Sequence, residues 1–101
     1  MLLNARNSGD ALCIDLTGEL DESTAKGVAS KIDDYVLRAR PKSVTLNLAR
    51  LTFMDSTGIG VILGRYRKLN SAGIRLFVAN PTKLVDKILL TTGIYDIIPK
   101  T

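Results

Sequence analysis

The chain alternates between segments with the two-residue period of β-strands and segments with the three- to four-residue period of α-helices. Polar and apolar residues alternate over 43–48, and short apolar runs occupy 12–16 and 74–78. These three segments are predicted strands. Residues 2–6 are a candidate edge strand, and a short last strand is expected from the isoleucines near the end of the chain, Ile94, Ile97 and Ile98.

Between the strands the apolar residues recur at helical spacing. One helix is predicted near 22–39, with Asp21 or Ser23 as its capping residue. Two more are predicted between residues 56 and 73 and between residues 81 and 93, where proline precedes and glycine follows the last pattern. Three predicted helices therefore alternate with the strands.

Such alternation with short connections is typical of an α/β fold. We expect a small mixed, partly parallel sheet of four to five strands with about three helices packed on it. With 101 residues, 46% of them apolar, the chain is long enough for one hydrophobic core and too short for two typical domains. Residues 1–101 are therefore expected to form a single domain.

The absence of histidine restricts the chemistry that this chain can perform alone. A Ser-His-Asp triad, a Cys-His pair and a histidine-ligated metal site cannot be built. Cys13 is the single cysteine, so no internal disulfide forms, and its apolar surroundings favour a small buried thiol. We expect no enzyme activity, no cofactor and no metal.

Charge and hydropathy place few limits on the partner. The net charge is +4, which is a mild excess rather than the dense basic stripe of many nucleic-acid-binding proteins. No segment approaches the roughly 18 to 20 apolar residues of a membrane span, and the first residues lack the pattern of an export signal. We therefore expect a cytoplasmic protein that binds neither membrane nor nucleic acid directly.

The most informative segment is Asp55-Ser56-Thr57-Gly58-Ile59-Gly60, where a strand and loop lead into the middle helix. The first three residues are all good caps, so a simple capping role is one interpretation. The glycines need another explanation, because each glycine inside a helix costs roughly 1 kcal/mol relative to alanine. Close packing on the sheet is one explanation for them, and a smooth surface for a protein partner is the other.

The glycines do not belong to a known cofactor motif. The segment lacks the lysine and spacing of a phosphate-binding loop, and it lacks the later glycine of a dinucleotide fingerprint. It is not a nucleophile elbow either, because the residue two before Ser56 is Met54. Ser56 is thus interpreted as a target of chemistry done by another protein.

The segment from Leu51 to Tyr66 resembles the signature of bacterial anti-sigma factor antagonists, which are free-standing members of the STAS family. A second segment, from Leu16 to Asp21, is similar to the family's loop between its second strand and first helix. The resemblance covers most of the chain in the right order and is closest to the sporulation-type antagonists. It implies the α/β fold already expected from the periodicity.

The resemblance also implies a phosphorylation switch. Family members bind an anti-sigma factor that is also a serine kinase, release the sigma factor, and are inactivated when that kinase phosphorylates the serine that here is Ser56. A PP2C-type phosphatase reverses the modification. The resemblance, together with the position of these residues, predicts a partner-binding surface made by Glu19, Leu20, Asp21, Asp55, Ser56, Thr57, Gly58, Ile59, Gly60 and Arg65.

Three departures from the family pattern carry expectations of their own. Thr57 stands where a second serine is common and offers a hydroxyl that competes for phosphate. Ala49-Arg50 stands where acidic residues often occur, which changes the charge offered to a kinase. The chain stops at Thr101, which leaves little room for the usual last helix.

Two other functions are compatible with the residues. The chain can be a STAS module of another signalling assembly, or a detached transporter domain, although the segment around Ser56 favours the antagonist. A different class is nucleic-acid binding through the basic residues Arg65, Arg67, Lys68 and Arg75, which would show a steep salt dependence.

Overall fold

The computed structural model describes all residues from Met1 to Thr101. Its elements follow the predicted alternation of strands and helices, and the three predicted helices and the candidate edge strand are all present. In chain order they are β1 (Leu2–Ser8), β2 (Ala11–Leu20), α1 (Ala25–Ala39), β3 (Ser43–Met54), α2 (Ser56–Ser71), β4 (Arg75–Ala79), α3 (Lys83–Thr91) and the 3-10 helix η1 (Ile94–Asp96).

The strands form one four-stranded sheet in the order β1-β2-β3-β4. β1 pairs antiparallel with β2, whereas β2, β3 and β4 run parallel to one another. The parallel pairs are connected through α1 and α2, which is the connection that parallel strands require. The expectation of a mixed, partly parallel α/β sheet is confirmed.

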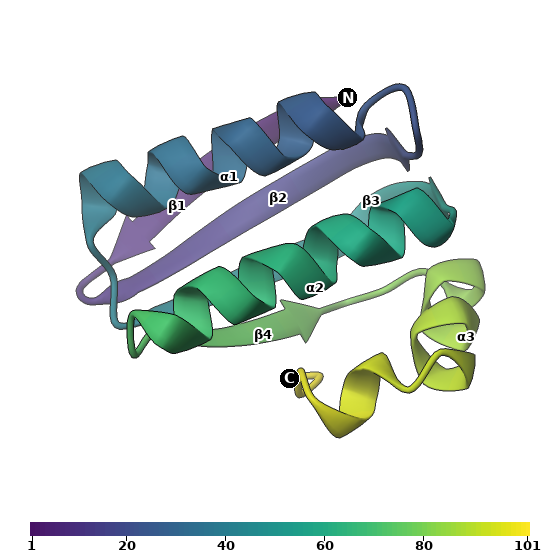
Figure 1. Ribbon diagram of the computed structural model, residues 1–101. Helices are drawn as coiled ribbons and strands as arrows, with labels where there is room; N and C mark the ends of the chain where they lie inside the picture. The colour runs from purple at the N-terminus through teal and green to yellow at the C-terminus, as the bar shows by residue number, and fades with distance from the viewer.

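One face of the sheet carries the core, and α1 and α2 lie across that face (Figure 1). The alternation in β2 and β3 turns Leu12, Ile14, Val44 and Leu46 inward, and each is at most 2% exposed. Ile32 of α1 joins them from the helix side at 1% exposed. The opposite face of the sheet has no helix over it, so the molecule has two layers.

The start of α1 differs slightly from the prediction. Residues 22–24 form a turn, and the helix proper begins at Ala25. Asp21 holds this turn, because the backbone N–H of Ala25 donates to its carbonyl oxygen at 2.9 Å. The N-cap of α1 is Thr24, which makes no side-chain capping bond, so the prediction of Asp21 or Ser23 as the cap is wrong; Asp21 instead stabilises the turn before the helix.

The predicted strand at the C-terminal isoleucines is wrong. Gly93 has a left-handed backbone (φ 77°) that reverses the chain after α3, and η1 follows directly. Ile94 and Ile98, four residues apart, both point into the core, while Ile97 is 46% exposed. This is helical spacing over a segment too short for periodicity to separate helix from strand. A single parallel bridge to β4 is formed later, between Lys100 and Val78.

None of the helices combines the length and apolar character needed to cross a membrane.

Candidate functional site

The site is built where β3 ends and α2 begins. Asp55 is the residue before α2, and its side chain accepts a hydrogen bond from the backbone N–H of Gly58 at 2.9 Å. Its carbonyl oxygen accepts a second bond from the N–H of Ile59 at 3.0 Å. Of the three candidate caps in the sequence, Asp55 therefore fills the role.

Because Asp55 caps the helix, the next two hydroxyls are free for other uses. Ser56 and Thr57 are exposed in the first turn of α2, and neither side chain makes a hydrogen bond within the chain. Free N–H groups and the helix dipole favour negative charge at this helix end. The arrangement can accept a phosphoryl group on either hydroxyl, and it provides no imidazole base to activate one.

The loop after β2 lies directly against this helix start. The N–H of Asp55 donates to the carbonyl oxygen of Leu20 at 3.3 Å. The same oxygen would lie 2.5 Å from a Cβ placed on Gly58. Glycine is required here because any side chain would displace one of the two backbones. The two segments that carry the family resemblance are thus joined, backbone to backbone.

Hydrogen bonds within the β2–α1 loop hold it in place. The carboxylate of Asp21 accepts from the hydroxyl of Ser23 at 2.7 Å and from its N–H at 2.9 Å. These bonds, led by the Ser23 hydroxyl, lower the pKa of Asp21 below its usual value. The hydroxyl of Thr24 donates to the carbonyl oxygen of Glu19 at 2.8 Å, so the loop is closed on both sides.

Two of the predicted surface residues lie below the surface. Leu20 is fully buried and Gly58 is buried against it, so in this conformation neither residue is accessible to a partner. Their part is to position the loops. Glu19 and Gly60 are exposed and Ile59 is half-buried, and a Cβ on Gly60 would meet nothing within 4 Å.

Arg65 is engaged inside the chain. Its Nε lies 3.0 Å from the Oδ1 of Asp33 on α1, so the two side chains form an ion pair, but the N–H does not point at the oxygen and no hydrogen bond is formed. The Arg65 side chain is 17% exposed. The Nζ of Lys68 pairs with the Oδ2 of the same aspartate at 3.1 Å. This cluster ties α1 to α2 and neutralises part of the basic run that suggested nucleic-acid binding. Arg75 is the first residue of β4 and is not part of α2.

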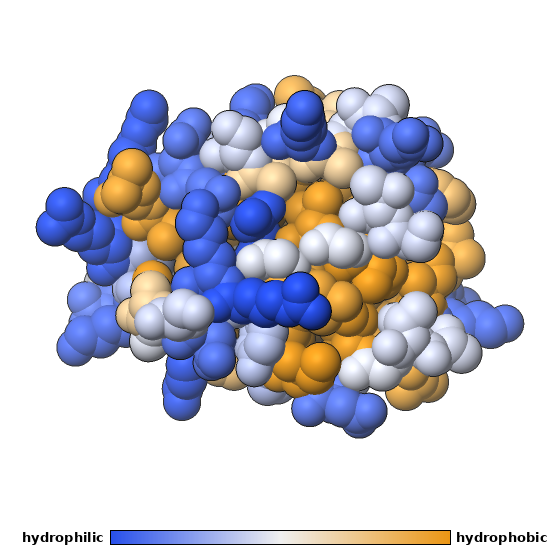
Figure 2. Space-filling model, viewed as in Figure 1, coloured by the Kyte–Doolittle hydropathy of each residue, from blue (hydrophilic) through white to orange (hydrophobic).

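Apolar side chains near the site were missed by the sequence reasoning. Phe53, two residues before the cap, is 39% exposed, and Leu84 in the first turn of α3 is 49% exposed. The hydroxyl of Thr82 donates to the carbonyl oxygen of Leu51 at 3.3 Å, which brings the start of α3 beside the end of β3. Figure 2 shows apolar surface gathered over α2 and α3 on this side of the molecule. Leu84 is one of the apolar residues at helical spacing that predicted the last helix, and this spacing alone does not show that its side chain is exposed.

The model of the STAS domain matches residues 3–101. The chain belongs to the STAS domain family. This match covers all the strands and helices described above except the first residue of β1, so the expected family is confirmed along with its fold.

Curated relatives of this STAS domain are named as antagonists of anti-sigma factors. The anti-sigma F factor antagonist of Paenibacillus polymyxa is 38% identical over 87% of this chain and 75% of the relative. The protein of the same name from Lysinibacillus sphaericus is 32% identical over 84% of this chain and 73% of the relative.

Solved structures agree with the sequence relatives. The anti-sigma factor antagonist SpoIIAA in its unphosphorylated form aligns with this STAS domain at a TM-score of 0.81 and 28% identity, covering 99% of this chain and 88% of that one. The Bacillus cell fate determinant SpoIIAA in its phosphorylated form aligns at 0.73 and 27% identity, covering 99% and 91%.

Proposed function

We propose that this chain is an anti-sigma factor antagonist that changes partners when Ser56 is phosphorylated. Its unphosphorylated form binds an anti-sigma factor that is also a serine kinase, and this binding releases the sigma factor. Phosphorylation of Ser56 ends the binding, and a PP2C-type phosphatase restores it. The exchange takes place in the cytoplasm and requires no catalytic residue of this chain.

The observation that carries the proposal is the free hydroxyl of Ser56 at the start of α2. Asp55 already caps the helix, so the hydroxyl has no structural duty within the chain. The names of the relatives from Paenibacillus polymyxa and Lysinibacillus sphaericus support the same function. SpoIIAA has been described in both an unphosphorylated and a phosphorylated form, which supports a modification of this kind.

The physical effect of the phosphate falls on the interface rather than on the fold. A phosphate adds about −1.5 to −2 charges, and a helix N-terminus stabilises each nearby charge by ~0.3–1 kcal/mol. The modified chain therefore stays folded. In a docked complex the new dianion meets groups arranged for a hydroxyl, and an uncompensated buried charge costs several kcal/mol. Binding is expected to weaken by orders of magnitude.

The proposed docking surface combines exposed residues of α2 with residues at the ends of β2 and β3. Thr57 and Gly60 continue along the exposed side of α2, while Glu19 near the end of β2 and Asp21 in the loop after it contribute from the neighbouring segment. Phe53 supplies exposed apolar area at the end of β3. A partner that binds this apolar area and the acidic residues Glu19 and Asp21 is expected to bind more weakly when a phosphate on Ser56 adds further negative charge between them.

The proposal is tested by incubating the purified chain with the anti-sigma kinase of the same genome and ATP. Intact mass should rise by one phosphate, and peptide mapping should place it on Ser56. Ser56→Ala should remove the mass shift, while Thr57→Ala should retain it. Phosphate found mainly on Thr57, or unchanged phosphorylation in Ser56→Ala, would contradict the assignment.

A further inference from the structure

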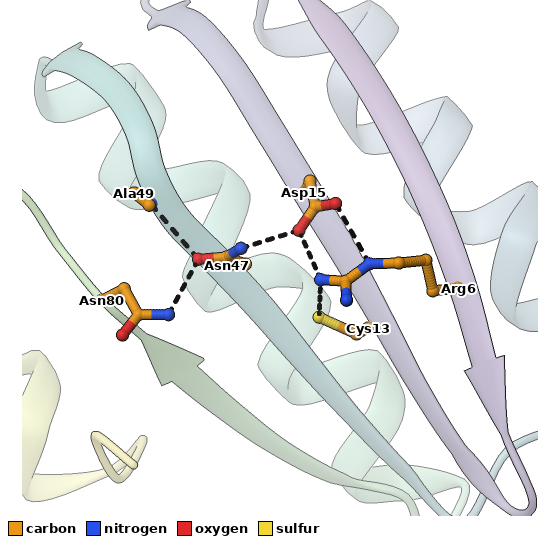
Figure 3. A network of polar contacts seen from close by, with 6 residues as sticks. All are labelled: Arg6, Cys13, Asp15, Asn47, Ala49 and Asn80. Carbon is orange, nitrogen blue, oxygen red and sulfur yellow. Dashed lines mark hydrogen bonds and ion pairs between the residues drawn. The ribbon is translucent and has the colours of Figure 1, made fainter.

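The second surface of interest is the face of the sheet that no helix covers. Parallel strands are usually covered on both faces, yet β2, β3 and β4 are covered on one face only. In Figure 3 this outer face is turned to the viewer and the helices lie behind the strands. Half-buried side chains lie along this face on neighbouring strands, namely Cys13, Asp15, Thr45, Asn47, Phe77 and Ala79. The expectation of a buried thiol at Cys13 is therefore wrong, because its strand position turns the side chain to the uncovered face. A face of this kind is suited to a covering layer supplied by another molecule.

A network of hydrogen bonds fixes the polar side chains of this face. The guanidinium of Arg6 donates to both oxygens of Asp15, from Nε at 3.2 Å and from Nη2 at 2.8 Å. The amide of Asn47 donates to the Oδ1 of Asp15 at 2.7 Å, and its own oxygen accepts from Asn80 at 3.2 Å (Figure 3). The network crosses from β1 to the end of β4 and holds its members in one arrangement before any partner arrives.

Beside the network lies a hollow of about 300 Å³ with uncompensated positive charge. Its polar lining comes from β1, β2 and β3, and comprises Asn4, Arg6, Asp15, Thr17, Asn47 and Arg50. Asp15 neutralises Arg6, whereas Arg50 takes no part in any of the chain's ion pairs. The hollow thus offers one free guanidinium, together with hydroxyl and amide donors, to a group that accepts hydrogen bonds.

We propose that this open sheet face is a second docking surface, where a carboxylate of an acidic segment in a partner protein enters the hollow and pairs with Arg50. Arg75 lies outside the hollow, beside Ser43 in the register of β4 with β3, and its guanidinium is 5.4 Å from the centre of the Phe77 ring. A second copy of the chain is disfavoured, because its net charge of +4 and its own arginines would repel this face.

The surface is separate from the one proposed around Ser56. The hollow is formed by strand residues on the side of the sheet away from α2, whereas Ser56 begins α2 itself. The proposal does not depend on the function proposed above, since it concerns other residues and another face.

The test uses a short acidic peptide, acetyl-Ser-Glu-Val-Glu-Ser-amide, titrated into the full chain labelled with nitrogen-15. Saturable shifts are expected in the amide signals of Asp15, Thr17, Asn47 and Arg50. The matched peptide with glutamine in place of glutamate is expected to bind at least tenfold more weakly, because the charged hydrogen bond is lost.

Two variants separate the hollow from general charge attraction. Arg50→Gln should weaken binding of the acidic peptide about tenfold, the loss of one charge-assisted pair. Arg38→Gln is the matched control, because Arg38 is an exposed arginine on α1 with the same charge and no place in the hollow, and it should leave the affinity unchanged. Equal weakening in both variants would overturn the proposal, and so would equal binding of the glutamine peptide.

A small-anion site is the remaining outcome to distinguish. Inorganic phosphate and acetate are titrated in parallel at the same ionic strength. The peptide is expected to bind at least tenfold more tightly than either ion, because it makes side-chain and backbone contacts along the sheet in addition to the pair between its carboxylate and Arg50. Phosphate binding as tight as that of the peptide, with the same signals shifted, would overturn the assignment to a protein segment. Phosphorylation of Ser56 is measured in the Arg50→Gln variant as well. If it is unchanged, the function proposed above stands whether or not the acidic peptide binds in the hollow.

Discussion

Gly58 lies so close to the carbonyl oxygen of Leu20 that a methyl group on the glycine would be 2.5 Å from that oxygen. The Cγ of Met54 would lie 2.8 Å from the same methyl group. This approach joins the start of α2 to the last residue of β2, where the loop to α1 begins. Both segments of the proposed docking surface are therefore placed by one contact between a glycine and a peptide group.

Gly58→Ala is expected to destabilise the fold by ~1–3 kcal/mol, because overpacking outweighs the gain in helix propensity. The obstructing atom is backbone oxygen, which has no rotamer to change. Urea unfolding of the variant and the parent measures the difference. A stability equal to that of the parent would show that the two loops separate easily, and would contradict the positioning role of Gly58.

Gly60→Ala is expected to do the opposite. A Cβ on Gly60 meets nothing within 4 Å, so the substitution should raise stability by up to about 1 kcal/mol through helix propensity. It should also weaken binding to the anti-sigma partner, because a methyl group is added to a surface proposed to be in close contact.

The measurements for Gly60 are urea unfolding and calorimetric titration with the partner. Gly64→Ala is the matched control, since a Cβ on Gly64 also meets nothing within 4 Å and Gly64 lies one turn farther from Ser56. An affinity loss in Gly64→Ala as large as that in Gly60→Ala would place the contact elsewhere on α2. Unchanged affinity in Gly60→Ala would remove this residue from the docking surface.

The sequence was sufficient for those parts of the fold that follow from local periodicity. Alternation over 43–48 predicted β3, and the cap and glycine pattern predicted where α2 starts. The end of the chain was mispredicted, because Ile94 and Ile98 occupy barely one turn and carry no clear period.

Long-range pairs were beyond sequence reasoning because periodicity reports on one element at a time. Asp33 and Arg65 lie on two different helices, and only their packing brings the charges together. Asp15 and Asn47 are 32 residues apart and meet through the register of β2 with β3. The burial of Leu20 has the same cause, because this last residue of β2 is covered by the start of α2 at Gly58.

Ser56→Asp is expected to abolish most binding to the anti-sigma partner while leaving the fold intact. A carboxylate is favourable at a helix N-terminus but not in an interface formed around a hydroxyl. Circular dichroism and thermal melting should change little, and calorimetric titration should show the loss. Ser56→Asn is the control for size without charge and should retain more of the affinity. An unchanged affinity in the aspartate variant would contradict the proposed switch.

The last prediction concerns pH and the network on the open sheet face. Hydrogen bonds from Arg6, and then from Asn47, lower the pKa of Asp15 below its usual value. A carboxyl group whose pKa is lower in the folded state stabilises the fold above the unfolded pKa of about 4, and this stabilisation is lost as the pH falls through the folded value. Asp15→Asn should therefore be less stable than the parent at pH 7, and the two should converge as the pH is lowered below about 4.

Urea midpoints at pH 7, 4 and 2.5 measure this convergence. Asp34→Asn is the control, because Asp34 is exposed on α1 and makes neither an ion pair nor a side-chain hydrogen bond, so its substitution should not reproduce the pattern. A gap between Asp15→Asn and the parent that stays constant from pH 7 to pH 2.5 would mean that the loss comes from packing or from an altered amide orientation. In that case the ionised carboxylate of Asp15 would not be what holds Arg6 and Asn47 in place beside the hollow.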